Sequence, residues 1–152
     1  MNEISHAQKT KLTLTMSCVA VRVALATAFL SAVADRFGLW GPPGADGVVW
    51  GSIEEYENYV ALLNSFLPSV LISPIGWIVT VLEILIAIGL LFGWQIRWFA
   101  LSAAFLLTLF ALAMLNAFGA KPPLDYSVFS AASAALLLYA VEASRGSAEC
   151  SN

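Results

Sequence analysis

Four long apolar stretches constrain this chain more than any other feature of its sequence. They cover about residues 12–37, 72–93, 97–118 and 126–143, and each is rich in Leu, Ala, Val and Phe. A helix needs about 20 mostly apolar residues to cross a bilayer, whereas a transmembrane strand shows about 10 residues of alternating polarity. The stretches are long and do not alternate. The sequence therefore predicts an all-α integral membrane four-helix bundle, built as one domain over residues 1–152.

The composition excludes a soluble enzyme, a disordered chain and a nucleic-acid-binding protein. Apolar residues make up 60% of the chain and charged residues 11%, against about 45–50% and about 25% in soluble domains. A chain of 152 residues cannot bury that much apolar surface in a water-soluble core. The net charge of −3 also argues against binding to phosphate backbones. We therefore expect a lipid bilayer as the surroundings and no nucleic acid partner.

The sequence is poor in metal ligands. Its only cysteines are Cys18 and Cys150, and its only histidine is His6. These three residues are too few for a haem pair, an iron–sulfur cluster or a structural zinc site. We therefore expect no metal site and no redox cofactor held by this chain alone.

The first apolar stretch has a second interpretation. It follows Lys9 and Lys11 and ends in Ala-Val-Ala at residues 32–34, which resembles the cleavage site of a secretory signal peptide. Arg22 interrupts the run, however, and the run is long enough to span. A transmembrane helix is the favoured interpretation.

The basic residues predict an orientation. Positively charged residues near helix ends favour the cytoplasmic side. With both termini in the cytoplasm, four basic residues lie inside and two outside: Lys9, Lys11, Arg97 and Arg145 against Arg36 and Lys121. The polar tail over residues 144–152 is then cytoplasmic, and we expect it to be frayed.

One long connection, over residues 38–71, contains a predicted surface helix. Ser52 and Glu55 have the spacing of a capping box, in which the serine side chain accepts from the backbone N–H three residues later. Apolar residues then recur at helical spacing up to Pro68. The pattern predicts a short amphipathic extracytoplasmic helix over about residues 52–67, lying on the membrane or capping the bundle.

Two charged residues fall inside the predicted spans. Arg22 lies near the middle of the first stretch and Glu83 near the middle of the second. Because buried charges are costly in a bilayer unless they are paired, we predict a buried Arg22–Glu83 ion pair. Such a pair could be a proton-linked switch, an anion site or a static contact that fixes which helices are neighbours.

Polar residues also gather at the predicted outer ends of the helices. We expect an outer polar pocket formed by Asp35, Arg36, Asn116, Lys121, Asp125 and Tyr126. Asp125 could cap the fourth helix, and ordinary interfacial anchoring is the alternative interpretation of the whole group. As a site, the set suits an anionic small molecule or a quinone headgroup.

Three segments resemble the DoxX family of small membrane proteins. The first is FLSAVADRFGLWGPPG at residues 29–44, preceded by Arg22; the second is Glu83 followed by GLLFG at residues 89–93; the third is AKPPLDYS at residues 120–127. The likeness covers about residues 18–142. In that family, Arg22 and Glu83 match polar positions of the first two helices, and Asp35 and Arg36 match the end of the first helix.

The resemblance implies a four-helix bundle in the bacterial inner membrane. It also implies a subunit or accessory of a membrane redox complex linked to quinone, which explains the oxidoreductase label that many family members carry. Because the chain offers no redox ligands, a quinone or a partner would have to supply the redox centre. The alternatives are a structural subunit that scaffolds a larger complex without chemistry, and a small transporter-like bundle that binds lipid or anions. We expect the chain to be a homo-oligomer or a subunit of a larger membrane complex.

Overall fold

The computed structural model describes residues 2–149 and is built from helices. Its elements follow in the order α1 (Asn2–Arg36), α2 (Ile53–Leu63), the single 3₁₀ turn η1 (Ser69–Leu71), α3 (Ile72–Phe92), α4 (Ile96–Phe118), α5 (Lys121–Asp125) and α6 (Val128–Glu149). The helices containing the four apolar stretches, α1, α3, α4 and α6, are long and apolar enough to cross a membrane. The predicted all-α membrane bundle is confirmed.

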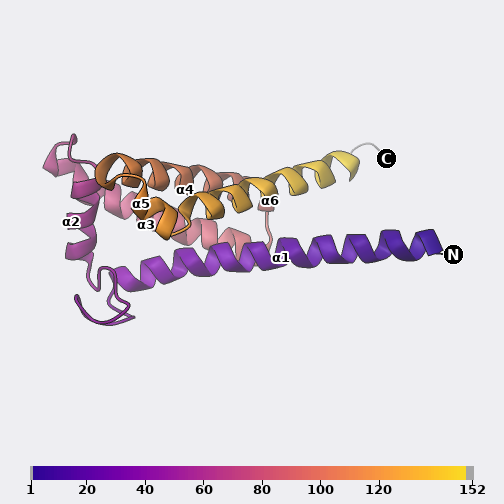
Figure 1. The fold of residues 1–152 in the computed structure, drawn as a ribbon, viewed down its shortest axis with the longest axis horizontal. Coiled ribbons are helices and arrows are strands. Elements are labelled where there is room, and N and C mark those ends of the chain that lie inside the picture. Colours follow the sequence, from indigo (N-terminus) through magenta and orange to yellow (C-terminus); the bar gives the residue numbers. More distant parts are fainter. Residues whose placement is uncertain (1, 150–152) are drawn as a thin grey trace.

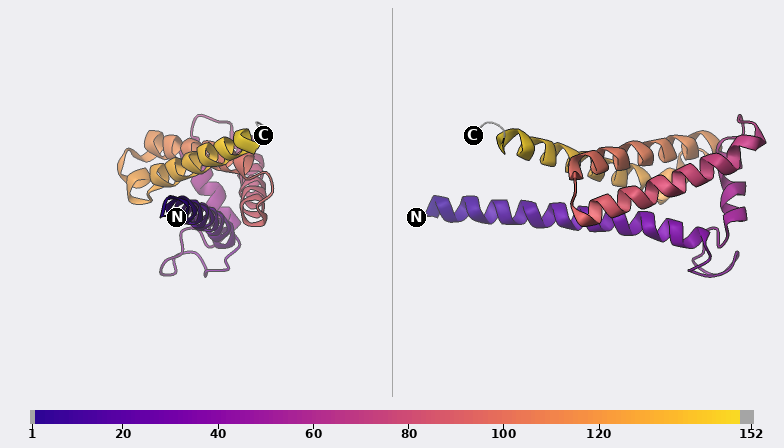
Figure 2. Two further views of the ribbon diagram at one scale, coloured as in Figure 1. Left: turned by 90° about the vertical axis from the view of Figure 1, so that its right-hand side faces the viewer. Right: turned by 180° about the vertical axis from the view of Figure 1, so that it is seen from behind.

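The long helices lie side by side, and α2 crosses one end of them (Figure 1). Both described ends of the chain lie at the opposite end of the bundle, and Figure 2 shows the same arrangement from two further directions. We call the two ends of the bundle the α2 end and the terminal end. The structure therefore has one end covered by a helix and a long loop, and another from which α1 and α6 project.

The bundle consists of two closely packed helix pairs. α1 packs mainly on α3, and α4 packs mainly on α6. The pairs meet in a shared core that includes Ala26 and Leu90 on one side and Ala103 and Ala135 on the other, none of them exposed to solvent. Small alanine side chains allow this close approach of helix backbones.

The turn between α3 and α4 is short because glycine ends α3. Gly93 has a φ of +75° and donates its N–H to the Gly89 carbonyl, 3.1 Å away. This left-handed conformation is typical of helix C-termini and favours glycine. The tight turn makes α3 and α4 an antiparallel hairpin.

Several predicted boundaries are wrong. α1 begins well before residue 12, and α6 continues to Glu149, so residues 144–149 of the tail are helical where fraying was expected. Cys150 lies outside the described residues. Asp125 does not cap the last helix: it ends α5, and α6 begins after Ser127. The prolines at 122 and 123 explain this, because Pro suits the first turn of a new helix and starts α5 there.

The surface helix exists but is shorter than predicted. Ser52 Oγ accepts from the Glu55 N–H at 3.2 Å, which confirms that half of the capping box. α2 ends at Leu63, where Asn64 turns back to donate its N–H and its side-chain amide to the Val60 carbonyl. The amide of Asn64 competes with the next helical turn, and the helix stops before Pro68.

Candidate functional site

A cavity of about 1250 Å³ lies between the two helix pairs, beneath α2. All four long helices and α2 contribute to its wall, which is mainly apolar. Its polar side chains gather at the α2 end, where α1 terminates and α2 covers the bundle. A lipid-soluble molecule with a polar head matches this division of polarity.

A buried ion pair forms the deepest polar contact of the cavity. Arg36, at the end of α1, is 2% exposed and is paired with Glu83 in the middle of α3, which is 1% exposed. Arg36 Nη1 also donates to Thr80 Oγ1 at 2.8 Å, and Thr80 donates in turn to the Gly76 carbonyl. The pair ties the end of α1 to the centre of α3.

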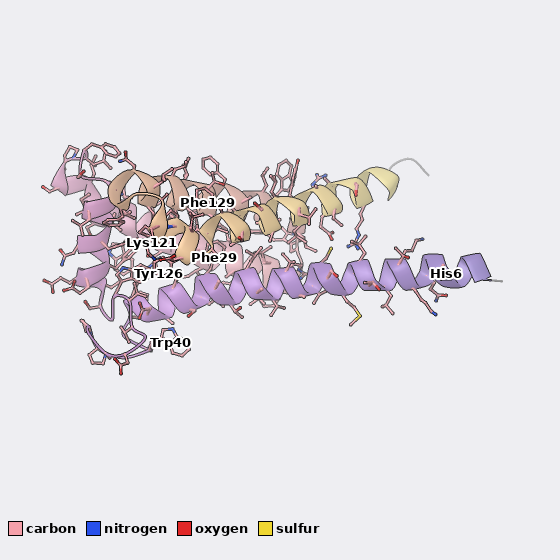
Figure 3. The ribbon with its side chains drawn as sticks, in the orientation of Figure 1. His6, Phe29, Trp40, Lys121, Tyr126 and Phe129 are labelled. Carbon is pink, nitrogen blue, oxygen red and sulfur yellow. The ribbon has the colours of Figure 1, made fainter. Side chains whose placement is uncertain are left out.

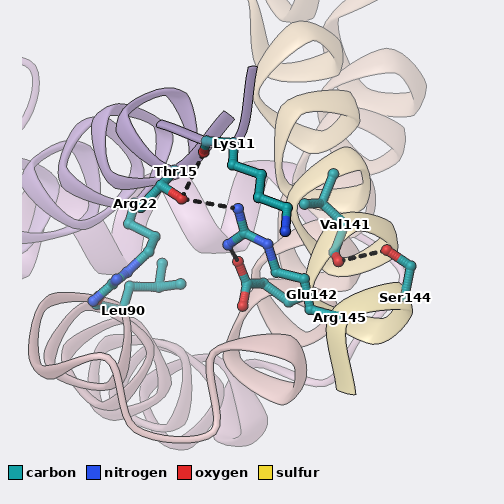
Figure 4. A network of polar contacts seen from close by, with 8 residues as sticks. All are labelled: Lys11, Thr15, Arg22, Leu90, Val141, Glu142, Ser144 and Arg145. Atoms are coloured by element: carbon teal, nitrogen blue, oxygen red, sulfur yellow. Dashed lines mark hydrogen bonds and ion pairs between the residues drawn. The ribbon is translucent and has the colours of Figure 1, made fainter. Parts of the chain in front are cut away.

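The predicted Arg22–Glu83 pair is therefore wrong. Arg22 donates from Nε to the Leu90 carbonyl at 2.8 Å and from Nη2 to the Leu91 carbonyl at 3.2 Å. Figure 4 shows Arg22 directed at Leu90, on the side of the bundle where Arg145 bridges Thr15 and Glu142. These carbonyls belong to the last turn of α3, two turns beyond Glu83.

The length of α1 explains the error. At about 1.5 Å per residue, 35 residues extend about 52 Å, well beyond the about 30 Å of a bilayer core. Counting from the apolar run alone placed Arg22 at the midpoint of a span. The packed helix is displaced along its axis, so Arg22 lies level with the C-terminus of α3, where carbonyl oxygens carry partial negative charge.

Asp35 holds the loop that follows α1. Its Oδ2 accepts from the backbone N–H groups of Val49 and Trp50, at 3.1 and 2.9 Å. The two ends of the loop approach closely there: the backbones of Gly51 and Pro43 are so near that a Cβ on Gly51 would lie 2.5 Å from the Pro43 nitrogen. Asp35 thereby places the Trp50 ring beside the ion pair.

Aromatic rings from α2 and its approach surround Arg36. The guanidinium carbon lies 3.9 Å from the centre of the Tyr56 ring and 5.2 Å from that of Trp50. Gly76 gives Tyr56 room to lie on α3, since a Cβ at that position would be 3.2 Å from Tyr56 Cε1. Such cation–π contacts contribute more when they are desolvated.

Four buried polar atoms of this site make no hydrogen bond among the described residues. One, Glu83 Oε2, is held in the ion pair with Arg36, and the other three are Asp35 Oδ1, Arg36 Nε and Trp50 Nε1. A buried polar group without a partner costs about 1–3 kcal/mol. The residues that line this end of the cavity thus carry two unsatisfied N–H donors and one unsatisfied carboxylate acceptor.

Two tyrosines of α2 remain neutral donors at ordinary pH. Burial raises the pKa of Tyr56 above its usual 10.0; Glu83 also raises it, while Arg36 and a hydrogen bond with Thr80 lower it. Burial, and then Tyr126, raise the pKa of Tyr59. Both phenols keep their protons throughout the neutral range.

The outer polar pocket forms only in part. Asp35, Arg36, Asn116 and Tyr126 line the cavity, but Lys121 and Asp125 do not. Lys121 and Asp125 form an ion pair with each other along α5, and their side chains are 83% and 57% exposed. Exposed pairs of this kind are ordinary surface contacts.

Sequence reasoning missed the residues that complete the site. They are Trp50, Tyr56, Tyr59 and Thr80, all in or beside the cavity. One signal for Thr80 was present, because Gly76, Thr80 and Glu83 recur on one face of the predicted helix. No local signal placed the aromatic residues of the loop and α2 over that face.

The charge of the site limits what it can hold. Two carboxylates, Asp35 and Glu83, and one guanidinium, Arg36, give a net charge of −1 when ionised. Within the described part of the chain, no group of three or more His, Cys, Asp or Glu side chains could hold a metal ion. The arrangement suits a neutral headgroup that accepts hydrogen bonds.

Comparison with protein-family models, with curated proteins and with solved structures found no match.

Proposed function

We propose that the protein is a DoxX-like subunit of a quinone-linked redox complex in the bacterial inner membrane, with both termini cytoplasmic. The observation that carries the proposal is the cavity: a mainly apolar wall with unpaired donors at one end. An isoprenoid quinone has this division, with an apolar tail and a head bearing two carbonyl oxygens.

The donors and the acceptor would have separate roles. Arg36 Nε and Trp50 Nε1 would donate to quinone carbonyl oxygens, and Asp35 Oδ1 would accept from a quinol hydroxyl. A bound quinone supplies the capacity to accept two electrons and two protons. The electrons would come from the redox centre of a partner subunit.

The charge balance favours a quinone over an anion. Arg36 is already neutralised by Glu83, and Asp35 adds a further negative charge. A sulfur oxyanion or an anionic lipid headgroup would meet net repulsion at this place. The transporter-like alternative for anions is therefore the weaker proposal.

The first test is gentle extraction of the protein from its native membrane, followed by organic extraction of bound small molecules. Co-purified quinone, or a stoichiometric redox partner seen by native mass spectrometry, would support the proposal. Protein that carries only phospholipid and does not bind added decylubiquinone would contradict it.

A matched pair of variants tests the site itself. Trp50→Phe keeps a ring but removes the N–H donor, whereas Trp77→Phe changes an exposed ring that packs on Phe37 outside the cavity. One hydrogen bond of about 1 kcal/mol corresponds to roughly a fivefold change in affinity. We expect that loss of decylubiquinone affinity for Trp50→Phe and none for Trp77→Phe.

A further inference from the structure

The cavity has two long sides, and they differ. Because α1 pairs with α3 and α4 pairs with α6, one side of the cavity lies between α1 and α6 and the other between α3 and α4. Either side faces the surroundings of the bundle, which for spanning helices is lipid. The side chains along each side decide which one is open.

Small side chains line the α1–α6 side. On α1 these are Ala28, Ser31 and Ala32, of which Ala28 and Ser31 are exposed as well as lining the cavity. Across from them on α6 lie Val128 and Ala131. Residues that line a cavity and are also exposed mark its rim. Because the rim residues on this side have small side chains, they leave a wide gap between α1 and α6.

Large side chains line the α3–α4 side. Val79 of α3, Leu109 and Leu112 of α4, and Phe66 after α2 all line the cavity. Leu109, Leu112 and Phe66 are exposed. The rim on this side is therefore formed by larger side chains than the rim between α1 and α6, and it leaves a narrower gap for an entering molecule.

Two aromatic residues bracket the small-residue side at the α2 end. Trp40 and Tyr126 both line the cavity and are largely exposed. Trp40 Nε1 donates to the Ser31 carbonyl at 3.1 Å, so the loop after α1 folds back along the rim. Figure 3 shows Trp40 near the end of α1 and Tyr126 near the α5–α6 corner, at the same end of the bundle. Amphipathic rings of this kind lie at the membrane–water interface.

The face toward water is covered. Tyr56 and Val60 of α2 are buried against α3, and Ser73 Oγ donates to Glu57 Oε1 at 2.6 Å, which ties α2 to the start of α3. A molecule approaching along the bundle axis would meet this helix before it reached Arg36.

We infer that the cavity opens sideways into the bilayer between α1 and α6, and that its ligand enters there from the lipid, passing between Trp40 and Tyr126. The identity of the ligand rests on the proposed function, but the opening rests on the side chains of the two sides alone. The protein would then take a membrane-dissolved molecule without exposing it to water.

The experiment reports on the opening through Trp50, which lies at the polar end of the cavity. A parent protein keeps Trp50 and carries phenylalanine at Trp77, Trp94 and Trp98 and tyrosine, which retains a ring and a donor, at Trp40; all four positions are exposed. It is placed in nanodiscs of phosphatidylcholine brominated at the middle of the acyl chain. Bromine quenches tryptophan only near contact, so quenching of Trp50 measures entry of acyl chains into the cavity.

Three variants of this parent separate the routes. Ala28→Phe narrows the α1–α6 side of the cavity. Ala24→Phe is the control, because it adds the same bulk one turn away on α1 at an exposed position that does not line the cavity. Leu109→Phe adds bulk to the α3–α4 side. We expect quenching in the parent, at least a twofold loss in Ala28→Phe, and parent-like quenching in the other two. Absence of quenching in the parent, equal loss in Ala28→Phe and Ala24→Phe, or loss confined to Leu109→Phe would each overturn the inference.

Decylubiquinone in unbrominated nanodiscs distinguishes this inference from the proposed function. If the quinone quenches Trp50 saturably and more slowly in Ala28→Phe, both stand. If brominated lipid behaves as expected but the quinone gives no saturable quenching, the proposed function fails while the opening stands. If the quinone quenches Trp50 saturably and Ala28→Phe does not slow this quenching, entry between α1 and α6 is contradicted, while the quinone proposal stands.

Discussion

The two arginines of α1 contact the same neighbouring helix, α3, at different places, Arg36 near its middle and Arg22 in its last turn, and they are satisfied in different ways. Arg36, at the α2 end, is buried and pairs with the Glu83 carboxylate. Arg22, nearer the terminal end, is partly exposed and caps the Leu90 and Leu91 carbonyls. The Arg36 guanidinium needs a full counter-charge because water is excluded around it. The partial charges of a helix C-terminus suffice for the Arg22 guanidinium, which is partly solvated. The comparison distinguishes the Arg36 site, which has unsatisfied donors beside the cavity, from the Arg22 contact, which only joins α1 to α3.

The largest expected effect is on the buried pair. Arg36→Met leaves the Glu83 carboxylate buried without its partner and should destabilise the fold by about 3–5 kcal/mol. Arg36→Met with Glu83→Met should cost much less, because neither charge remains. Reversible unfolding in mixed detergent micelles measures both. A double variant as unstable as the sum of the two single variants would show that the side chains act independently.

The next effect concerns the loop that Asp35 holds. Asp35→Ala leaves the N–H groups of Val49 and Trp50 without their acceptor, and we expect a loss of about 2–3 kcal/mol from two partly buried donors. Hydrogen exchange over residues 38–52 should speed up accordingly. Asp46→Ala, an exposed acid of the same loop, serves as the control and should leave exchange unchanged.

A smaller effect is expected for Arg22. Arg22→Met removes two hydrogen bonds to carbonyls that water can partly replace, so the loss should be about 1 kcal/mol. Gly93→Ala should weaken the same contact, since the added Cβ would lie 2.7 Å from Arg22 Nη2 at a φ of +75°. Detergent unfolding can compare the two. If Arg22→Met cost as much as Arg36→Met, the contrast between the arginines would collapse.

The smallest effect is expected for the exposed pair on α5. Lys121→Ala and Asp125→Ala should each change the free energy of unfolding by less than about 0.5 kcal/mol, because both side chains are solvated. Neither should alter decylubiquinone binding, since neither lines the cavity. A clear loss of quinone affinity in either variant would return these residues to the site.

Helices and their ends were predicted correctly where a single nearby sequence feature decides them. The four spans follow from runs of apolar residues, and the start of α2 follows from Ser52 and the N–H that it caps. The boundaries failed where two local causes compete, as at Asn64, where a side-chain amide ends α2 before Pro68. The prolines that begin α5 displaced Asp125 from its predicted cap in the same way.

The candidate site was half predicted. Asp35, Arg36, Glu83, Asn116 and Tyr126 do line one cavity. Arg22, Lys121 and Asp125 do not line it. Residue type and membrane depth identify which side chains need partners, but they do not identify the partners.

The amino-acid sequence by itself determined that this chain forms membrane-spanning helices, because backbone hydrogen bonds in lipid must be satisfied within each apolar segment. It also determined that the charged residues within those helices need polar partners. Only the tertiary structure decided that Glu83 pairs with Arg36 and that Trp50 and Tyr56 close over them. Axial displacement and helix pairing depend on how side chains pack between helices, and no single helix carries that information.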